Sequence, residues 1–458
     1  MMKLQDSHPC SLRRLAKSRI LSRRVRDQGP RPREKGAPKA EVRAKRVLYV
    51  DLAPGVGGSI ISLYYLVKGL DRQEYEPVVL LREQNPYVPR FRALGVAVAT
   101  IPGGGDGATY QDTAATAFAQ VVAAVRQGRL VQRLKNSKLG AGLVHLVGFY
   151  VRQLPRARRD AREIERHMAA LRPDLVHLND TVGVSRAALL AARRLRLKAI
   201  CHLRALDERH PFDRWLSRSL AGYICISQAV NRHQRTLGGR IAPAWVVYNG
   251  LDLADIDRPV DAAGVRAGLG LRPGDQVVGC VGRLVEWKGQ RVFIEALARL
   301  APEYPHLRGL IVGGAEANGQ AYEQELVALV HRLGLEDVVR FTGFRQDVPD
   351  LLRAMDVMVH ASTSPEPFGR VLIEGMAAGA AVIGTDAGAV PEIIQDGVTG
   401  LLVPPGDAAA LANALARALG DPQQRQAWCR AARQVVEQRF TMQTYVRGVM
   451  QVYKELIP

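Results

Sequence analysis

Cysteine is scarce in this sequence of 458 residues. No cysteine belongs to a Cys-x-x-Cys pair or to a metal-binding spacing, so neither a disulfide framework nor a cysteine-based metal site is indicated. No stretch approaches the roughly 18 uninterrupted apolar residues of a spanning helix, and the basic N-terminus lacks an apolar core with a cleavage site. We therefore expect a cytoplasmic protein that is neither secreted nor membrane-spanning. The cysteines are Cys10, Cys201, Cys225, Cys280 and Cys429.

Outside two segments the sequence also lacks an excess of positive charge, although its formal net charge is +20. Residues 1–46 carry +11 and residues 126–166 carry +8, which leaves the remaining chain nearly neutral. A fold whose whole surface binds polyanions is therefore not indicated, and we expect no specific nucleic-acid partner. Any anionic partner should contact those two segments.

The length of the chain predicts two domains, and its 47% hydrophobic and 24% charged residues are typical of a globular protein. Residues 1–45 are rich in Arg, Pro, Gly and Ser and poor in aromatics, which predicts a flexible basic tail. From Arg46 onward, short β-rich apolar runs alternate with helical patterns. This alternation predicts an α/β fold with parallel sheets.

Two such series can be separated. The first spans residues 46–255, with strands expected at 46–51, 77–81, 174–178, 197–202, 222–227 and 244–248. The pattern then loosens into a linker and restarts over residues 263–435, with strands expected at 276–281, 309–312, 338–342, 357–360 and 381–384. Residues 436–458 are expected to form a helical segment, and one hypothesis is that it packs back on the first domain. Two Rossmann-like, doubly wound domains that face each other across a ligand-binding cleft are predicted.

An insertion at about residues 103–170 interrupts the first domain. It has no convincing strand, but it contains a basic amphipathic pattern that would suit an anionic membrane surface. Packing of its apolar face into the first domain, with solvated arginines, is an equally good interpretation. The apolar residues at helical spacing are Leu139, Leu143, Leu146, Val147 and Tyr150.

The segment Ser364-Pro-Glu-Pro-Phe-Gly-Arg-Val-Leu-Ile-Glu-Gly-Met-Ala-Ala-Gly379 carries the strongest chemical pattern. Pro365 and Pro367 should hold Glu366 in a loop, and a helix should open at about Gly369. Free backbone N–H groups at that helix start would bind an anion, which suits a ligand with phosphates and hydroxyls. For Glu366 and Glu374 alone, a capping residue and a solvated helix residue are the simpler interpretation.

Two further loops strengthen the ligand interpretation. Gly282-Arg-Leu-Val-Glu-Trp-Lys-Gly289 follows the first strand of the second domain, so Arg283 and Lys288 should lie in the ligand crevice of a parallel sheet. Two cations there can neutralise a diphosphate. Gly313 and Gly314 close the next strand and allow a close approach of phosphate or base.

These residues, with Gly384-Thr-Asp-Ala-Gly-Ala-Val-Pro-Glu392, resemble glycosyltransferase family 4, a large retaining family with the GT-B fold. The resemblance implies that Arg283 and Lys288 bind the donor diphosphate, Glu374 the ribose hydroxyls and Glu366 the sugar hydroxyls. It makes His202 a histidine that faces the sugar, with His177 and Asn179 as weaker candidates. For His177 a buried structural role is as good an interpretation. Further donor-binding positions implied are Gly57, Gly58, Gly314, Phe344, Arg345, Phe368, Gly369, Arg370, Val371 and Leu372.

The resemblance implies transfer of a sugar from a nucleotide sugar to a saccharide or lipid-linked acceptor, with retention. No cofactor or metal is expected, because side-chain cations and a helix N-terminus supply the positive potential. Attachment to the inner face of the plasma membrane is the alternative to a purely cytoplasmic location. A sugar-nucleotide epimerase of similar fold and a non-catalytic nucleotide-sugar-binding scaffold stay open. A dinucleotide dehydrogenase is disfavoured, since Gly55-Val-Gly-Gly58 does not read G-x-G-x-x-G.

Overall fold

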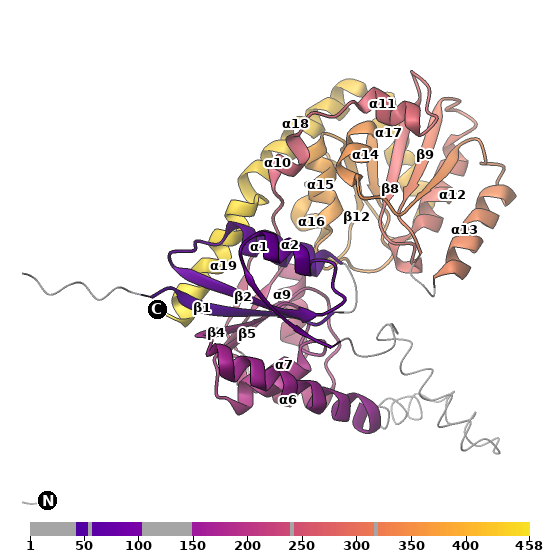
Figure 1. Ribbon diagram of the computed structural model, residues 1–458. Coiled ribbons are helices and arrows are strands. Elements are labelled where there is room, and N and C mark those ends of the chain that lie inside the picture. The colour runs from indigo at the N-terminus through magenta and orange to yellow at the C-terminus, as the bar shows by residue number, and fades with distance from the viewer. Residues whose placement is uncertain (1–42, 54–56, 103–148, 239–241, 316–318) are drawn as a thin grey trace, which may run out of the picture. The chain divides into compact units, whose positions relative to one another are not determined.

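The structure, a computed structural model, describes residues 43–53, 57–102, 149–238, 242–315 and 319–458 (Figure 1). Ala44–Pro458 form one compact unit. Its described strands form two sheets, of seven and six strands, and every strand pair within them is parallel. The expected α/β fold with two parallel sheets is confirmed.

The first sheet has the order β3-β2-β1-β4-β5-β6-β7. Its strands are β1 (Lys45–Asp51), β2 (Tyr75–Arg82), β3 (Ala97–Ile101), β4 (Leu175–Leu178), β5 (Ala199–Leu203), β6 (Gly222–Cys225) and β7 (Ala244–Val246). The order reverses between β1 and β4, so this is the position where the carboxyl ends of the strands open a crevice. The edge strand β3 was not expected from the sequence.

Helices cover both faces of this sheet, because successive side chains of a buried strand point to opposite faces. In β1, Val47 and Tyr49 belong to one core cluster, and Leu48 and Val50 to another. Figure 1 shows α1 and α2 over one face and α6 and α7 over the other. The described helices of this half are α1 (Gly58–Gly69), α2 (Val88–Ala93), α6 (Leu154–Leu171), α7 (Arg186–Arg194), α8 (Pro211–Leu216) and α9 (Gln228–Thr236), with the helical turns η1 (Phe149–Gln153) and η2 (Ser217–Ser219).

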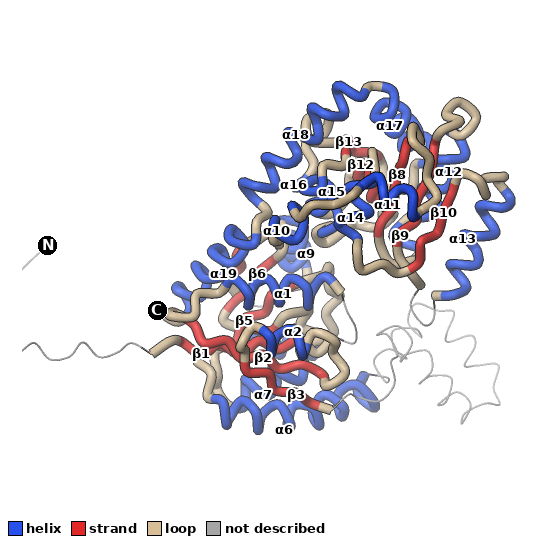
Figure 2. Tube along the Cα trace, turned by 45° about the horizontal axis from the view of Figure 1, so that its top comes forward, coloured by secondary structure: helices blue, strands red, loops and turns tan. Residues whose placement is uncertain are grey.

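The second sheet has the order β10-β9-β8-β11-β12-β13, and its order reverses between β8 and β11. Figure 2 shows its strands flanked by helices. The strands are β8 (Gln276–Val281), β9 (Leu307–Val312), β10 (Val339–Gly343), β11 (Val357–His360), β12 (Ala381–Thr385) and β13 (Leu401–Val403). The helices are η3 (Glu286–Lys288), α12 (Gln290–Leu300), α13 (Gln320–Arg332), α14 (Val348–Ala354), α15 (Arg370–Ala378), α16 (Val390–Ile393), α17 (Ala408–Gly420) and α18 (Pro422–Arg439).

The expected linker contains two short helices, α10 (Leu253–Asp257) and α11 (Ala262–Gly268), where the sequence predicted only a loosened pattern. Each helix is started by an aspartate whose side chain accepts a backbone N–H. Asp252 accepts from Ala254 at 3.1 Å, and Asp261 accepts from Gly264 at 2.9 Å. Aspartates that read as loop residues in the sequence act as helix caps here.

The last helix, α19 (Met442–Leu456), packs against α1 and shares its core with β1. Tyr453 links α19 to β1 and β4, because its hydroxyl lies 3.2 Å from the hydroxyl of Tyr49 and 2.6 Å from Nδ1 of His177. Of the basic tail, residues 1–42 lie outside the described residues, and β1 begins at Lys45.

The expected insertion is described only from residue 149 onward, so the predicted apolar residues from Leu139 to Val147 lie outside the described residues. In the described part, α6 buries Ala161, Ile164 and Met168 in the core beneath the first sheet. Tyr150 is exposed. The apolar face of α6 therefore belongs to the core.

Candidate active site

The loops after β8 and β9 bring Arg283 and Gly314 together. The N–H of Leu284 donates to the carbonyl of Gly314 at 3.1 Å, and the side chain of Leu284 is fully buried. The carbonyl of Arg283 accepts from Nε2 of Gln290 at 2.8 Å. Leu284 thus anchors the loop while the Arg283 side chain stays exposed at the carboxyl end of β8.

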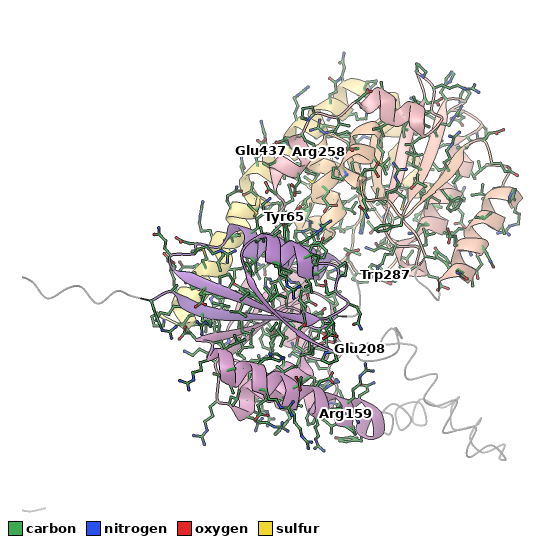
Figure 3. The ribbon with its side chains drawn as sticks, in the orientation of Figure 1. Tyr65, Arg159, Glu208, Arg258, Trp287 and Glu437 are labelled. Carbon is green, nitrogen blue, oxygen red and sulfur yellow. The ribbon has the colours of Figure 1, made fainter. Side chains whose placement is uncertain are left out.

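Lys288 ends the short helix η3 and pairs with Glu366, which seven residues separate from Glu374 in the segment named here E-x7-E. Its ammonium nitrogen lies 2.6 Å from Oε2 of Glu366 and 4.2 Å from the ring centre of Trp287. Trp287 is labelled in Figure 3. Gly289 follows in the left-handed region at φ 72°, where an added Cβ would lie 1.9 Å from the carbonyl oxygen of Ala361. Only glycine fits this approach, which holds η3 close to the end of β11.

Glu366 is buried, and a histidine that the sequence did not single out also holds it. Nε2 of His360 lies 3.0 Å from Oε2 of Glu366, and Oγ of Ser362 lies 3.4 Å from the same oxygen. Burial on its own would raise the pKa of Glu366, but the hydrogen bond from His360 and the charge of Lys288 outweigh it and lower the pKa to about 2. Glu366 is therefore a carboxylate at neutral pH.

The backbone of Glu366 is fixed as well as its side chain. Its carbonyl accepts from the N–H of Ala389 at 2.9 Å. Gly388, at φ 64°, lies so close that an added Cβ would be 2.3 Å from the same carbonyl oxygen. The Gly384–Glu392 segment therefore supports the loop that carries Glu366.

Helix α15 starts directly after this loop, with Gly369 as its N-cap. Towards other described residues, the N–H groups of Phe368 and Gly369 donate no hydrogen bond. The side chains of Phe368 and Leu372 are buried in the core, and Val371 packs against it. Any ligand contact of these predicted positions would accordingly come from their backbone at the positive end of the helix.

Arg370 joins the E-x7-E segment to helix α1 of the first domain. Its guanidinium donates to Oε1 of Glu374 at 3.1 Å, to Oγ of Ser62 at 3.2 Å and to the carbonyl of Gly250 at 3.3 Å. An added Cβ at Gly58 would lie 3.2 Å from Cδ of Arg370. Gly57 is the N-cap of α1. The structure thus brings both glycines near the start of α15.

The loop that carries Phe344 and Arg345, two predicted donor-binding positions, begins at the end of β10. Phe344 is 77% exposed there, and an added Cβ at Gly314 would lie 3.5 Å from the Cβ of Phe344. Arg345 pairs with Asp347 through two hydrogen bonds of 2.8 and 2.5 Å. An exposed aromatic ring beside a glycine offers a stacking surface for a nucleobase.

His202 lies apart from this group, in a buried cluster of the first sheet. It is fully buried, with Nδ1 at 3.2 Å from Nε2 of His177 and 3.3 Å from Nη2 of Arg204. Arg204 also donates to Oδ1 of Asn179 at 2.8 Å and to the hydroxyl of Tyr445 at 2.8 Å. Burial lowers the pKa of His177 and of His202 well below the ordinary value. The buried interpretation of His177 is confirmed, and a sugar contact of His202 stays a prediction.

Among the described residues, no three His, Cys, Asp or Glu side chains are grouped so that they could hold a metal ion. None of the helices in the described ranges is long and apolar enough to cross a membrane.

Two family models of glycosyltransferases match the two halves of the chain. The family model described as Glycosyltransferase Family 4 matches residues 56–255, and the model described as Glycosyl transferases group 1 matches residues 264–435. The lipopolysaccharide core biosynthesis mannosyltransferase LpsB of Rhizobium meliloti is 30% identical over 274 residues, which are 59% of this chain and 76% of LpsB. A D-inositol 3-phosphate glycosyltransferase of Kribbella flavida is 35% identical over 201 residues, 43% of this chain and 47% of the relative.

The fold also matches solved structures. The crystal structure of Anabaena HepE in complex with UDP and glucose has a TM-score of 0.71 and 27% sequence identity, and the match covers 90% of this chain and 100% of that one. The sucrose-phosphate synthase of Thermosynechococcus elongatus, at 21% identity, has a TM-score of 0.68 over 90% of this chain and 99% of its own. Together with the two parallel sheets, these matches confirm the GT-B fold.

Proposed function

On the premise that this chain belongs to glycosyltransferase family 4, we propose that it transfers a sugar from a nucleoside-diphosphate sugar to a hydroxyl acceptor with retention of anomeric configuration. Membership in the family rests on the two family models and on LpsB. The nucleotide-sugar donor is supported by HepE, whose crystal structures hold UDP and UDP-glucose.

The observation that carries the proposal is the pair of Lys288 and Glu366 beside the start of α15. A cation, a buried carboxylate and open backbone N–H groups meet at the carboxyl ends of β8 and β11. Parallel sheets bind ligands at this edge, where their order reverses. A cation and a helix N-terminus suit phosphates, and a carboxylate suits sugar hydroxyls.

The proposed reaction breaks the bond between the anomeric carbon and the diphosphate oxygen. Negative charge grows on the leaving diphosphate, and Lys288, Arg283 and the start of α15 stabilise it. The acceptor oxygen attacks from the face that the diphosphate leaves, and a departing phosphate oxygen takes the acceptor proton. No metal enters this scheme, because side-chain cations and the helix N-terminus are proposed to supply the positive potential.

We assign the acceptor to cell-surface polysaccharide, lipopolysaccharide or glycolipid synthesis. The relatives support this class through LpsB, which is named for lipopolysaccharide core biosynthesis. Attachment to the inner face of the plasma membrane would bring the enzyme to a lipid-linked acceptor. The exposed arginines Arg156, Arg158 and Arg159 of α6 are available for it.

The proposal is tested with a donor panel of UDP-glucose, UDP-galactose, UDP-N-acetylglucosamine and GDP-mannose. The wild-type chain should release the nucleoside diphosphate and free or transferred sugar from at least one donor. Recovery of an intact, epimerised nucleotide sugar would establish the epimerase alternative. Binding of a donor with no turnover, in the presence of cell-envelope extract as a source of acceptor, would favour the scaffold.

A further inference from the structure

Between described residues, the hydrogen bonds of the Glu366 carboxylate all go to one oxygen. Lys288 and His360 both contact Oε2, at 2.6 and 3.0 Å. Among the hydrogen bonds between described residues, none engages Oε1. One carboxylate oxygen is thus fixed by the protein, and the other is left for a ligand hydroxyl.

The proton of the His360 contact must lie on Nε2. The pKa of Glu366 is lowered to about 2 because the hydrogen bond and the nearby cation overcome the effect of burial, so its carboxylate accepts only. His360 therefore donates from Nε2, and Oγ of Ser362, 3.1 Å away, lies close to the same nitrogen. The tautomer follows from the acceptor that faces the ring.

Packing alone does not explain why a histidine stands at position 360. It ends β11 after Val357, Met358 and Val359, and it is only 4% exposed. Its Nδ1 is buried without a hydrogen-bond partner among the described residues. A buried polar atom without a partner destabilises a fold, so a leucine would fit this strand better. Among the described residues, the imidazole has hydrogen-bond partners only at Nε2, namely Glu366 and Ser362.

We propose that His360 is a positioning residue for the sugar part of the donor. It keeps Oε2 of Glu366 in place when Lys288 turns from that carboxylate to the donor diphosphate. This inference rests on the proposed function, since it takes Lys288 as a diphosphate ligand and Glu366 as a sugar ligand. Without His360, the carboxylate loses its second strong donor at the moment when it must hold the sugar hydroxyls.

The experiment compares His360→Leu, His360→Gln and His360→Asn in the full chain. Glutamine places an amide N–H near the position of Nε2, whereas asparagine reaches only the position of Nδ1. Each variant is titrated with UDP and with UDP-glucose, or with GDP and GDP-mannose if the wild type uses that donor. The matched control is His331→Leu, which removes an exposed histidine of α13.

His360→Leu and His360→Asn should bind the nucleoside diphosphate like the wild type. Both should bind the nucleotide sugar about tenfold more weakly and lose kcat, because only the sugar contact is disturbed. His360→Gln should retain most of both quantities. The Tm of His360→Leu should equal or exceed that of the wild type, which separates a positioning role from a structural one.

Three results would overturn the inference: equal loss of diphosphate and nucleotide-sugar binding, unchanged sugar binding and kcat in His360→Leu, or His360→Asn as active as His360→Gln. If His360→Leu fails to fold, the Gln and Asn pair still decides the question, since both are amides. A wild-type chain that binds no nucleotide sugar would instead refute the proposed function. The two failures are therefore distinguishable.

Discussion

The ammonium nitrogen of Lys288 lies 2.6 Å from Oε2 of Glu366, and the two side chains are only 17% and 11% exposed. In the proposed function Lys288 binds the donor diphosphate and Glu366 binds the sugar, so the two proposed donor ligands form an ion pair with each other. Donor binding has to replace this ion pair with contacts to both parts of the donor. Each side chain would otherwise be a poorly compensated buried charge.

Glu366 should make the stability of the protein depend on acid pH. Its pKa is about 2 in the folded protein, below the ordinary 4.5, so its stabilising contribution is complete above pH 4.5 and is lost as the pH falls through 2. The shift corresponds to about 3 kcal/mol. Denaturant unfolding at pH 6, 4 and 2.5 should show a difference between wild type and Glu366→Gln that shrinks with falling pH. A difference that stays constant would contradict the pairing.

Lys288→Ala and Arg283→Ala should lower kcat more than donor affinity. Negative charge on the diphosphate increases toward the transition state, so the lost cation matters most there, and a loss of about 10² to 10³ in kcat is expected. Single-turnover kinetics and donor titration separate the two effects. Arg291→Ala is a suitable control, since Arg291 is the next arginine along the chain and pairs on the surface with Glu325. Unchanged turnover in both active-site variants would refute the assigned roles.

Glu374→Ala should mainly weaken nucleotide binding. If Glu374 holds the ribose hydroxyls, the loss of a charged hydrogen-bond partner should cost about 1.5 to 3 kcal/mol in calorimetry with the nucleoside diphosphate. Glu437→Ala is the matched control, because Glu437, labelled in Figure 3, accepts from Arg433 four residues earlier, as Glu374 does from Arg370. Equal affinities in Glu374→Ala and wild type would remove Glu374 from the ribose site.

The arginines of α6 should attach the protein to anionic vesicles at low salt. Arg156, Arg158 and Arg159 are exposed, and each basic residue near an anionic surface contributes about 1 kcal/mol. Arg159 is labelled in Figure 3. Sedimentation should persist after deletion of residues 1–45 and should weaken when all three become Glu.

The control for that measurement changes three other exposed arginines to Glu, namely Arg299, Arg332 and Arg430. This control changes the net charge by the same amount as the triple variant of α6, and it should leave sedimentation nearly unchanged. Equal sedimentation of the wild type with anionic and neutral vesicles would refute membrane attachment.

The sequence predicted the buried strands and the E-x7-E helix closely. β8 and β11 have the expected bounds, and α15 spans Arg370–Ala378 as the pattern indicated. The two strands are continuous apolar runs, and the helix is bounded by glycines. Both kinds of signal are local in the sequence. β3 and β13 were missed, because each is a short edge strand of its sheet, with five and three residues respectively.

The contacts within the site could be predicted only in part. Arg370 and Glu374 are four residues apart on one helix, a spacing that favours their ion pair. His360 gave no signal, since it ends the apolar run Val357-Met-Val-His360 like an ordinary strand residue. Its contact with Glu366 depends on how the loop after β11 turns back, which no local pattern specifies. For His202, the resemblance implied a sugar contact, but the sequence did not reveal that this side chain is completely buried.

In the proposed mechanism, this glycosyltransferase stabilises a leaving nucleoside diphosphate with its own side chains. The most direct measurement is the rate of nucleoside diphosphate release from the preferred donor in excess EDTA, for wild type and for Lys288→Ala. We expect the wild type to keep its rate in EDTA, and the variant to be slow with or without magnesium, since the lost cation belongs to the protein. Complete loss of wild-type activity in EDTA, restored by magnesium, would refute this mechanism.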